Sequence, residues 1–136
     1  MPTSTPMSAK AIGDNPAPGF RQHPDHSVTL HPFDGTVTVA WNDTPIARSA
    51  KAIELHETNH QPVFYLPIED VDASLLRRSS HVTRCPFKGE ASYWDIVIGD
   101  HEIDNVLWGY ETPYDEMLEL AGLVAFYSSK VTITAG

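Results

Sequence analysis

The chain has 136 residues, 41% of them hydrophobic, which is enough for one domain with one core and too few for two ordinary domains. Eighteen acidic against nine basic side chains give a formal net charge of -9, and this field repels phosphate backbones and anionic lipid. We therefore expect neither nucleic acid nor a membrane among the partners. The chain does not open with a basic stretch and an apolar run, and no window is apolar over a membrane-spanning length, so the sequence predicts a soluble, cytoplasmic protein.

The first 25 residues are polar and rich in proline, with Pro2, Pro6, Pro16, Pro18 and Pro24. Proline at this density opposes both helix formation and strand pairing. We predict a flexible N-terminal arm over residues 1–25 and a folded domain over residues 26–136.

From Ser27 onward the sequence consists of short β-branched and aromatic runs separated by turn residues. Gly99-Asp100 between two such runs predicts a hairpin, and only Tyr114–Leu120 has a helical pattern, ended by Gly122. The predicted strands are 28–30, 36–41, 44–48, 52–57, 63–66, 92–98, 102–110 and 123–134. We predict one mainly β domain of antiparallel strands with one short helix.

Residues 56–60 match the H-E-x-x-H pattern of zinc metalloproteases. That chemistry needs a helix to bring both histidines to one face. Here the motif leaves an alternating strand and runs into Gln61-Pro62, which is poor helical context, so we interpret it as a strand end and a polar loop. A single cysteine cannot supply a four-cysteine zinc site or an internal disulfide. We expect no metal and no cofactor, and we interpret His23, His26 and His31 as solvated side chains.

The segment around Cys85 contains the only thiol of the chain, with His81, Arg84 and Lys88 close to it in sequence. Positive charge near a thiol favours the reactive thiolate. Pro86 and Gly89 mark a turn, so we expect Cys85 at a strand end. Most single cysteines are small buried hydrophobes, however, and the residue types alone leave both interpretations open.

A set of residues spread over the chain resembles, in order and spacing, the bacterial domain of unknown function 427. These are Arg48; Glu57; Val63-Phe64-Tyr65-Leu66-Pro67 with Asp70-Val71; His81-x-Thr83-x-Cys85-Pro86-x-Lys88-Gly89-x-Ala91-x-Tyr93-Trp94; Trp108-x-Tyr110-x-x-Pro113; and Ala125-Phe126-Tyr127. The resemblance spans about residues 28–131. It implies a β-tent fold, two antiparallel sheets set at an angle, as in methionine sulfoxide reductase B and the ligand-binding domain of cereblon. The family is also labelled nucleotidyltransferase-like, which nothing in this chain supports independently.

The resemblance further implies a polar pocket between the sheets, lined by Arg48, Glu57, Tyr65, His81, Cys85 and Lys88. Its relatives bind a structural zinc through two cysteine pairs, which one cysteine cannot provide. Several aromatic side chains could add walls to the pocket, among them Tyr93 and Trp108.

Our leading hypothesis is a pocket that binds or acts on a small molecule; if it is catalytic, Cys85 would be the nucleophile and His81 and Glu57 would move protons. The remaining residues would contact the ligand: Arg48, Tyr65, Lys88, Tyr93 and Trp108. The alternative is a non-catalytic module that binds a ligand or a protein. The sequence leaves open whether the protein is an enzyme, what its ligand is, and whether it forms a homo-oligomer.

Overall fold

Ten antiparallel strands form two sheets in the computed structural model, which describes residues 15–136. The strands are β1 (Val28–Pro32), β2 (Val37–Trp41), β3 (Thr44–Ser49), β4 (Ile53–Glu57), β5 (Val63–Pro67), β6 (Leu76–Cys85), β7 (Gly89–Ile98), β8 (His101–Gly109), β9 (Leu123–Phe126) and β10 (Thr132–Ala135). The helical segments are α1 (Pro18–Gln22) and three short 3₁₀ helices, η1 (Ile68–Asp70), η2 (Ala73–Leu75) and η3 (Asp115–Leu120).

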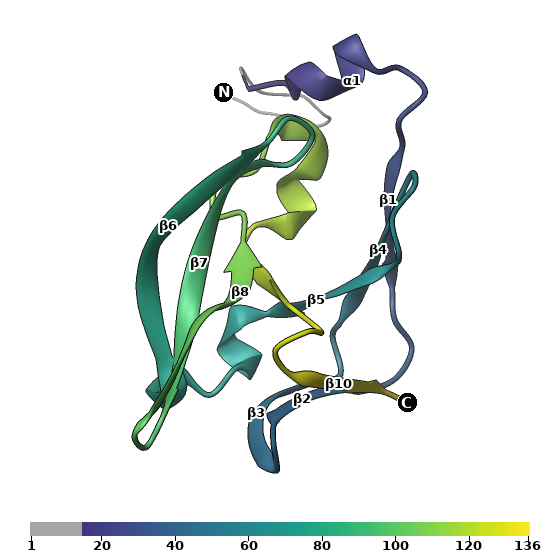
Figure 1. Cartoon of the computed structure of the whole chain (residues 1–136). Helices are drawn as coiled ribbons and strands as arrows, with labels where there is room; N and C mark the ends of the chain where they lie inside the picture. The colour runs from purple at the N-terminus through teal and green to yellow at the C-terminus, as the bar shows by residue number, and fades with distance from the viewer. Residues whose placement is uncertain (1–14) are drawn as a thin grey trace, which may run out of the picture.

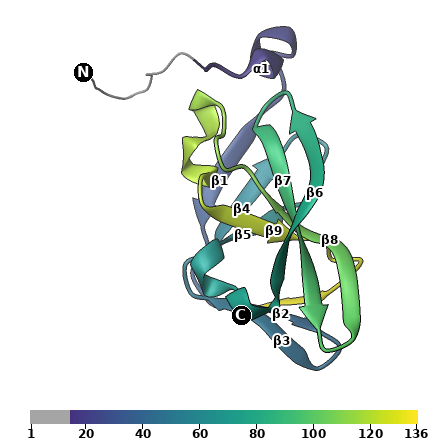
Figure 2. The same ribbon diagram turned by 90° about the vertical axis from the view of Figure 1, so that its left-hand side faces the viewer.

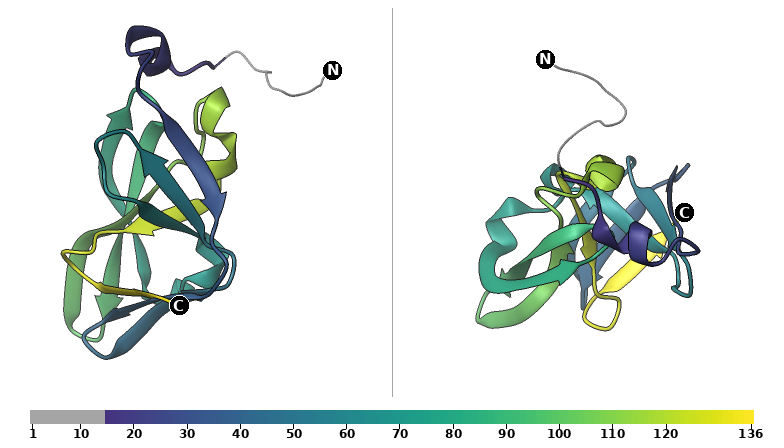
Figure 3. Two further views of the ribbon diagram at one scale, coloured as in Figure 1. Left: turned by 90° about the vertical axis from the view of Figure 1, so that its right-hand side faces the viewer. Right: turned by 90° about the horizontal axis from the view of Figure 1, so that it is seen from above.

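The larger sheet has seven strands in the order β1-β4-β5-β9-β8-β7-β6, and the smaller sheet has three in the order β10-β2-β3. In Figure 1, β6, β7 and β8 stand on one side of the molecule, β1 and β4 stand on the other, and β5 runs between them. The smaller sheet lies at one end, and Figures 2 and 3 show the same arrangement from other sides. The predicted fold class, mainly β with two antiparallel sheets, is confirmed.

Both faces of the larger sheet are apolar, because neighbouring residues of its strands enter two different cores. Leu66, Trp94 and Val124 pack with the smaller sheet in one core. The residue beside each of them in sequence enters the other core, which η3 covers: Tyr65, Tyr93 and Ala125. This is the period-two alternation of a strand, here with both faces buried. The second core contains the aromatic residues of the candidate site.

Two predicted elements differ from the structure. The apolar run 123–134 is not one strand but β9 and β10, which belong to different sheets and are separated by a turn. The predicted helix is the 3₁₀ segment η3. The helix α1 is not predicted from the sequence, because the proline content of this segment argues against a helix. Within residues 15–136, no helix has the length and apolar character required to cross a membrane.

The described part of the predicted arm packs on the domain instead of projecting from it. Residues 15–27, the strap hereafter, run along the β6–β7 turn, where the Gly19 amide donates to the Pro86 carbonyl at 2.9 Å and the Phe20 ring packs on Phe87 with centroids 5.0 Å apart. A Cβ at Gly19 would lie 2.6 Å from the Phe87 ring, so only glycine allows this approach. The folded part therefore begins before residue 26, while residues 1–14 of the predicted arm lie outside the described residues.

Replacing Phe20 should measure how much the strap contributes to stability. We expect Phe20→Ala to lower the free energy of unfolding by about 1–2 kcal/mol, less than for a fully buried phenylalanine because the ring is half-buried. Urea unfolding gives this value, and Arg21→Ala, an exposed neighbour on α1, is the matched control. Equal stability of the two variants would show that the strap is not part of the folded unit.

Candidate functional site

A hollow of about 360 Å³ opens beside the second core, where β4, β5 and the end of β8 meet the β6–β7 turn. It is lined by Leu55, Glu57, His60, Gln61, Val63, Tyr65, Lys88, Trp108 and Tyr110. Its walls are mainly aliphatic and aromatic, its charged groups are Glu57 and Lys88, and His60 and Gln61 add polar side chains. This combination of apolar walls and few polar groups is typical of small-molecule sites.

Strand alternation explains why these side chains meet. Leu55 and Glu57 are two apart on β4 and share a face, and Leu55 pairs in register with Val63 of β5. On the other side of the hollow, Trp108 of β8 pairs with Ala125 of β9, which is fully buried. The small Ala125 leaves space between two bulky neighbours, and Trp108 Nε1 donates a hydrogen bond to the Tyr65 hydroxyl oxygen at 3.2 Å.

Glu57 is the centre of a buried charged group. Lys88 Nζ donates to Glu57 Oε1 at 2.6 Å, and His26 Nε2 lies 2.8 Å from Glu57 Oε2. The side chains of Lys88 and Glu57 are only 8% and 9% exposed. Burial by itself raises the pKa of Glu57, but the hydrogen bonds from Lys88 and His26 outweigh burial, so the net pKa lies below its ordinary value. Glu57 is therefore a carboxylate at neutral pH.

Cys85 lies at the end of β6, as the sequence predicts, and is half-buried against the second core. Its Sγ is 3.8 Å from Lys88 Nζ, so the ammonium contacts both the thiol and the Glu57 carboxylate. A cation beside sulfur is the charge environment in which thiols become nucleophilic.

Tyr65 and Tyr110 supply two hydroxyl groups to the hollow from buried positions, with 2% and 7% of their surface exposed. Burial is the main reason that the pKa of each phenol is raised above its ordinary value. Both phenols therefore keep their protons at physiological pH and can donate hydrogen bonds.

Of the eight predicted site residues, the structure brings four to the hollow: Glu57, Tyr65, Lys88 and Trp108. Cys85 is not among the residues that line the hollow, but its Sγ contacts Lys88, which is. Tyr93 lies behind it in the second core, where its hydroxyl and that of Thr83 are 2.9 Å apart.

Arg48 and His81 lie elsewhere, which corrects their predicted place in the pocket. Arg48 is an exposed residue of β3 in the smaller sheet. His81 is exposed on β6, and its ring packs on Tyr93 with centroids 4.6 Å apart. Because a strand rises about 3.3 Å per residue, four residues separate His81 from Cys85 by about 13 Å. His81 therefore does not supply the imidazole that the sequence suggested for Cys85.

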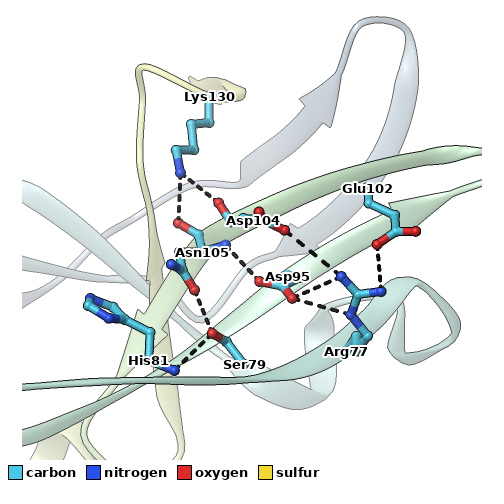
Figure 4. A network of polar contacts seen from close by, with 8 residues as sticks. All are labelled: Arg77, Ser79, His81, Asp95, Glu102, Asp104, Asn105 and Lys130. Atoms are coloured by element: carbon cyan, nitrogen blue, oxygen red, sulfur yellow. Dashed lines mark hydrogen bonds and ion pairs between the residues drawn. The ribbon is translucent and has the colours of Figure 1, made fainter.

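The surroundings of His81 form a polar network over β7 (Figure 4). The register between β6 and β7 shifts between Arg78 and Val82, and the register between β7 and β8 shifts between Trp94 and Ile96. A hydrogen bond joins these two irregular regions across β7: Ser79 Oγ of β6 donates to Asn105 Oδ1 of β8 at 2.6 Å.

Asp95 on β7 connects the same network to the adjoining strands. Its Oδ1 accepts from the Asn105 amide at 2.8 Å, and its Oδ2 accepts from Arg77. The polar groups near His81 thus stabilise two β-bulges, and this structural role is separate from the hollow.

Sequence reasoning missed His26 and left Tyr110 outside the final set. The sequence predicts a solvated His26, yet His26 contacts Glu57 and stacks on Phe87 with ring centroids 3.9 Å apart. No local sequence pattern predicts this contact, because it depends on the path of the strap. Tyr110 is one of the aromatic residues that could line a pocket by sequence, and it does line the hollow, two residues after Trp108.

The H-E-x-x-H match is a strand end and turn, as predicted. His56 and Glu57 are consecutive on β4 and point to opposite faces, so His56 Nε2 contacts Glu54 at 2.9 Å while Glu57 enters the hollow. Residues 15–136 contain no group of three or more His, Cys, Asp or Glu side chains arranged to hold a metal ion.

The pKa of Glu57 gives a pH-dependent prediction. A carboxyl whose pKa is lowered by folding stabilises the protein above its unfolded pKa of about 4.3, and this contribution disappears as the pH falls through the lower folded pKa. We expect wild-type protein to be more stable than Glu57→Gln above about pH 5, and the difference to shrink steadily toward pH 3. Urea unfolding of both proteins at several pH values measures it; a difference independent of pH would contradict the assignment.

Comparison with known proteins places this geometry in a family. No curated protein matches the chain. The protein-family model described as "Domain of unknown function (DUF427)" matches residues 29–135 of the sequence. These residues include every strand from β2 to β10 and every residue lining the hollow. The chain belongs to the DUF427 family.

Proposed function

We propose that the hollow is a binding site for a small organic molecule with a flat ring. The observation that carries this proposal is the pairing of an aromatic and aliphatic wall with one buried charged group, Lys88–Glu57. Flat rings gain most from Tyr65, Trp108 and Tyr110, because aromatic contacts add to simple area burial. The charged group gives such a ligand an orientation.

The cost of burying an ion pair supports a functional interpretation of Lys88 and Glu57. Desolvation of two charges often exceeds their mutual attraction, and apolar residues of similar size stabilise a core equally well or better. Among residues 15–136, the ammonium of Lys88 contacts Glu57 Oε1 and Cys85 Sγ, which accounts for two of its three N–H donors. The third is available to a ligand in the hollow that Lys88 lines.

Catalysis through Cys85 is the second candidate function, and the 3.8 Å contact between its Sγ and Lys88 Nζ favours it. In this version Lys88 supports the thiolate and Glu57 accepts or returns a proton. The nucleophile then acts without the imidazole of His81, because that ring packs on Tyr93.

A fragment screen tests the binding site. We expect flat aromatic fragments, and not saturated rings of equal size, to shift the NMR resonances of residues around the hollow. Trp108→Phe should weaken this binding about 3- to 10-fold, the factor given by a loss of roughly 1 kcal/mol. Trp41→Phe, in the smaller sheet, is the matched control and should leave it unchanged. Equal effects of the two variants would place binding outside the hollow.

Alkylation by iodoacetamide tests the second candidate. A nucleophilic Cys85 should be labelled in the native protein, and His81→Ala should leave the rate unchanged because its imidazole is remote from the sulfur. Labelling that requires unfolding would remove Cys85 as a nucleophile and leave the non-catalytic binding module. A slower rate in His81→Ala would contradict the geometry described for β6.

A further inference from the structure

The two phenol hydroxyls at the wall of the hollow hold protons that no neighbouring group accepts. The Tyr65 oxygen accepts from Trp108 Nε1 at 3.2 Å, which leaves the O–H proton of Tyr65 unused. Within residues 15–136, neither the Tyr65 nor the Tyr110 hydroxyl donates a hydrogen bond to an acceptor.

Each phenol therefore has an unused donor. Both residues are more than nine-tenths buried, where an unpaired donor costs free energy. Because both residues line the hollow, these O–H groups are available to a molecule inside it.

Lys88 adds a further unused donor to the same hollow, since within residues 15–136 its contacts with Glu57 and Cys85 leave one N–H available. The raised pKa of each phenol removes the alternative in which a tyrosine loses its proton and becomes an acceptor. The polar complement that this hollow requires is an acceptor.

We infer that the hollow binds its ligand through a neutral carbonyl oxygen attached to a flat ring, accepting from a free hydroxyl of Tyr65 or Tyr110 and from Lys88. This inference rests on the proposed binding site and names its ligand class. The carbonyl oxygen supplies the acceptor that these donors lack within residues 15–136.

The charge of the site selects a neutral acceptor over an anion or a cation. A ligand carboxylate at Lys88 would lie close to Glu57, which is itself a carboxylate and already neutralises the ammonium at 2.6 Å. It would also approach a chain of formal charge -9. The net charge would attract an ammonium ligand, but at these donors such a ligand offers no acceptor and would lie beside the Lys88 ammonium, which already neutralises Glu57.

Four probes of similar size separate these possibilities: benzamide with a neutral carbonyl, benzoate with a carboxylate, benzylamine with an ammonium, and toluene with the ring alone. We expect benzamide to bind about 5- to 10-fold more tightly than toluene in NMR titrations, the gain of one to two net hydrogen bonds. Benzoate and benzylamine should bind no better than toluene. Tighter binding of either charged probe than of benzamide would overturn the inference.

The double variant Tyr65→Phe, Tyr110→Phe removes both hydroxyl donors, while both aromatic rings still line the hollow. Either single variant leaves one phenol able to donate, so both hydroxyls have to be removed. We expect the double variant to bind toluene as the wild type does and to lose most of its preference for benzamide. Tyr114→Phe, whose hydroxyl contacts Arg84 outside the hollow, is the control and should keep that preference.

The outcomes distinguish the inference from the function on which it rests. If toluene and benzamide bind equally in wild type, or if the double variant keeps the preference, the hollow remains a binding site and the carbonyl assignment is wrong. If none of the four probes shifts the resonances of the hollow, the proposed site and the inference both fail.

Discussion

The buried contact between Lys88 and Glu57 joins the parts of the molecule that make the site. Glu57 ends β4 near one edge of the larger sheet, and Lys88 lies in the turn between β6 and β7 at the opposite edge. A 2.6 Å ion pair between them requires the sheet to bend until its two ends meet. Such a pair contributes little net stability, but breaking it would leave one charge buried alone, so it specifies one arrangement of the two ends.

The same bend explains why an aromatic hollow exists. Both faces of the larger sheet are apolar, one covered by the smaller sheet and the other by η3 and the strap. Where this second cover ends, Tyr65, Trp108 and Tyr110 still line the concave side. A fully covered sheet would have filled this volume with side chains at ordinary packing density. The hollow therefore exists because η3 and the strap cover only part of this face of the sheet. Its charged groups come from the end of β4 and from the β6–β7 turn, which converge there.

Much of this could be predicted from sequence, because strand alternation and turn residues are local signals. The hairpin at Gly99-Asp100, the end of β6 at Cys85 and the face shared by Leu55 and Glu57 all follow from neighbours in the chain. The errors arise where position depends on distant segments. Nothing in the run 123–134 marks the passage from one sheet to the other, and nothing near Arg48 indicates that its strand belongs to the smaller sheet.

His81 and His26 are two further residues whose positions could not be predicted from their neighbours in the chain: the first is expected in the site and lies outside it, and the second is not expected there and contacts Glu57. Alternate residues of a strand share a face, but four residues along β6 span about 13 Å, so the strand conformation expected for this segment does not bring the His81 imidazole to the Cys85 sulfur. His26 lies three residues before the matched family domain begins, in a segment whose prolines suggested an arm. Its contact with Glu57 extends the charged group to a third element, so that the strap, β4 and the β6–β7 turn converge on one carboxylate. Under the proposed function, a ligand that contacts Lys88 would meet a group whose geometry is also set by the strap, so the proposed site depends on the strap although no strap residue lines the hollow.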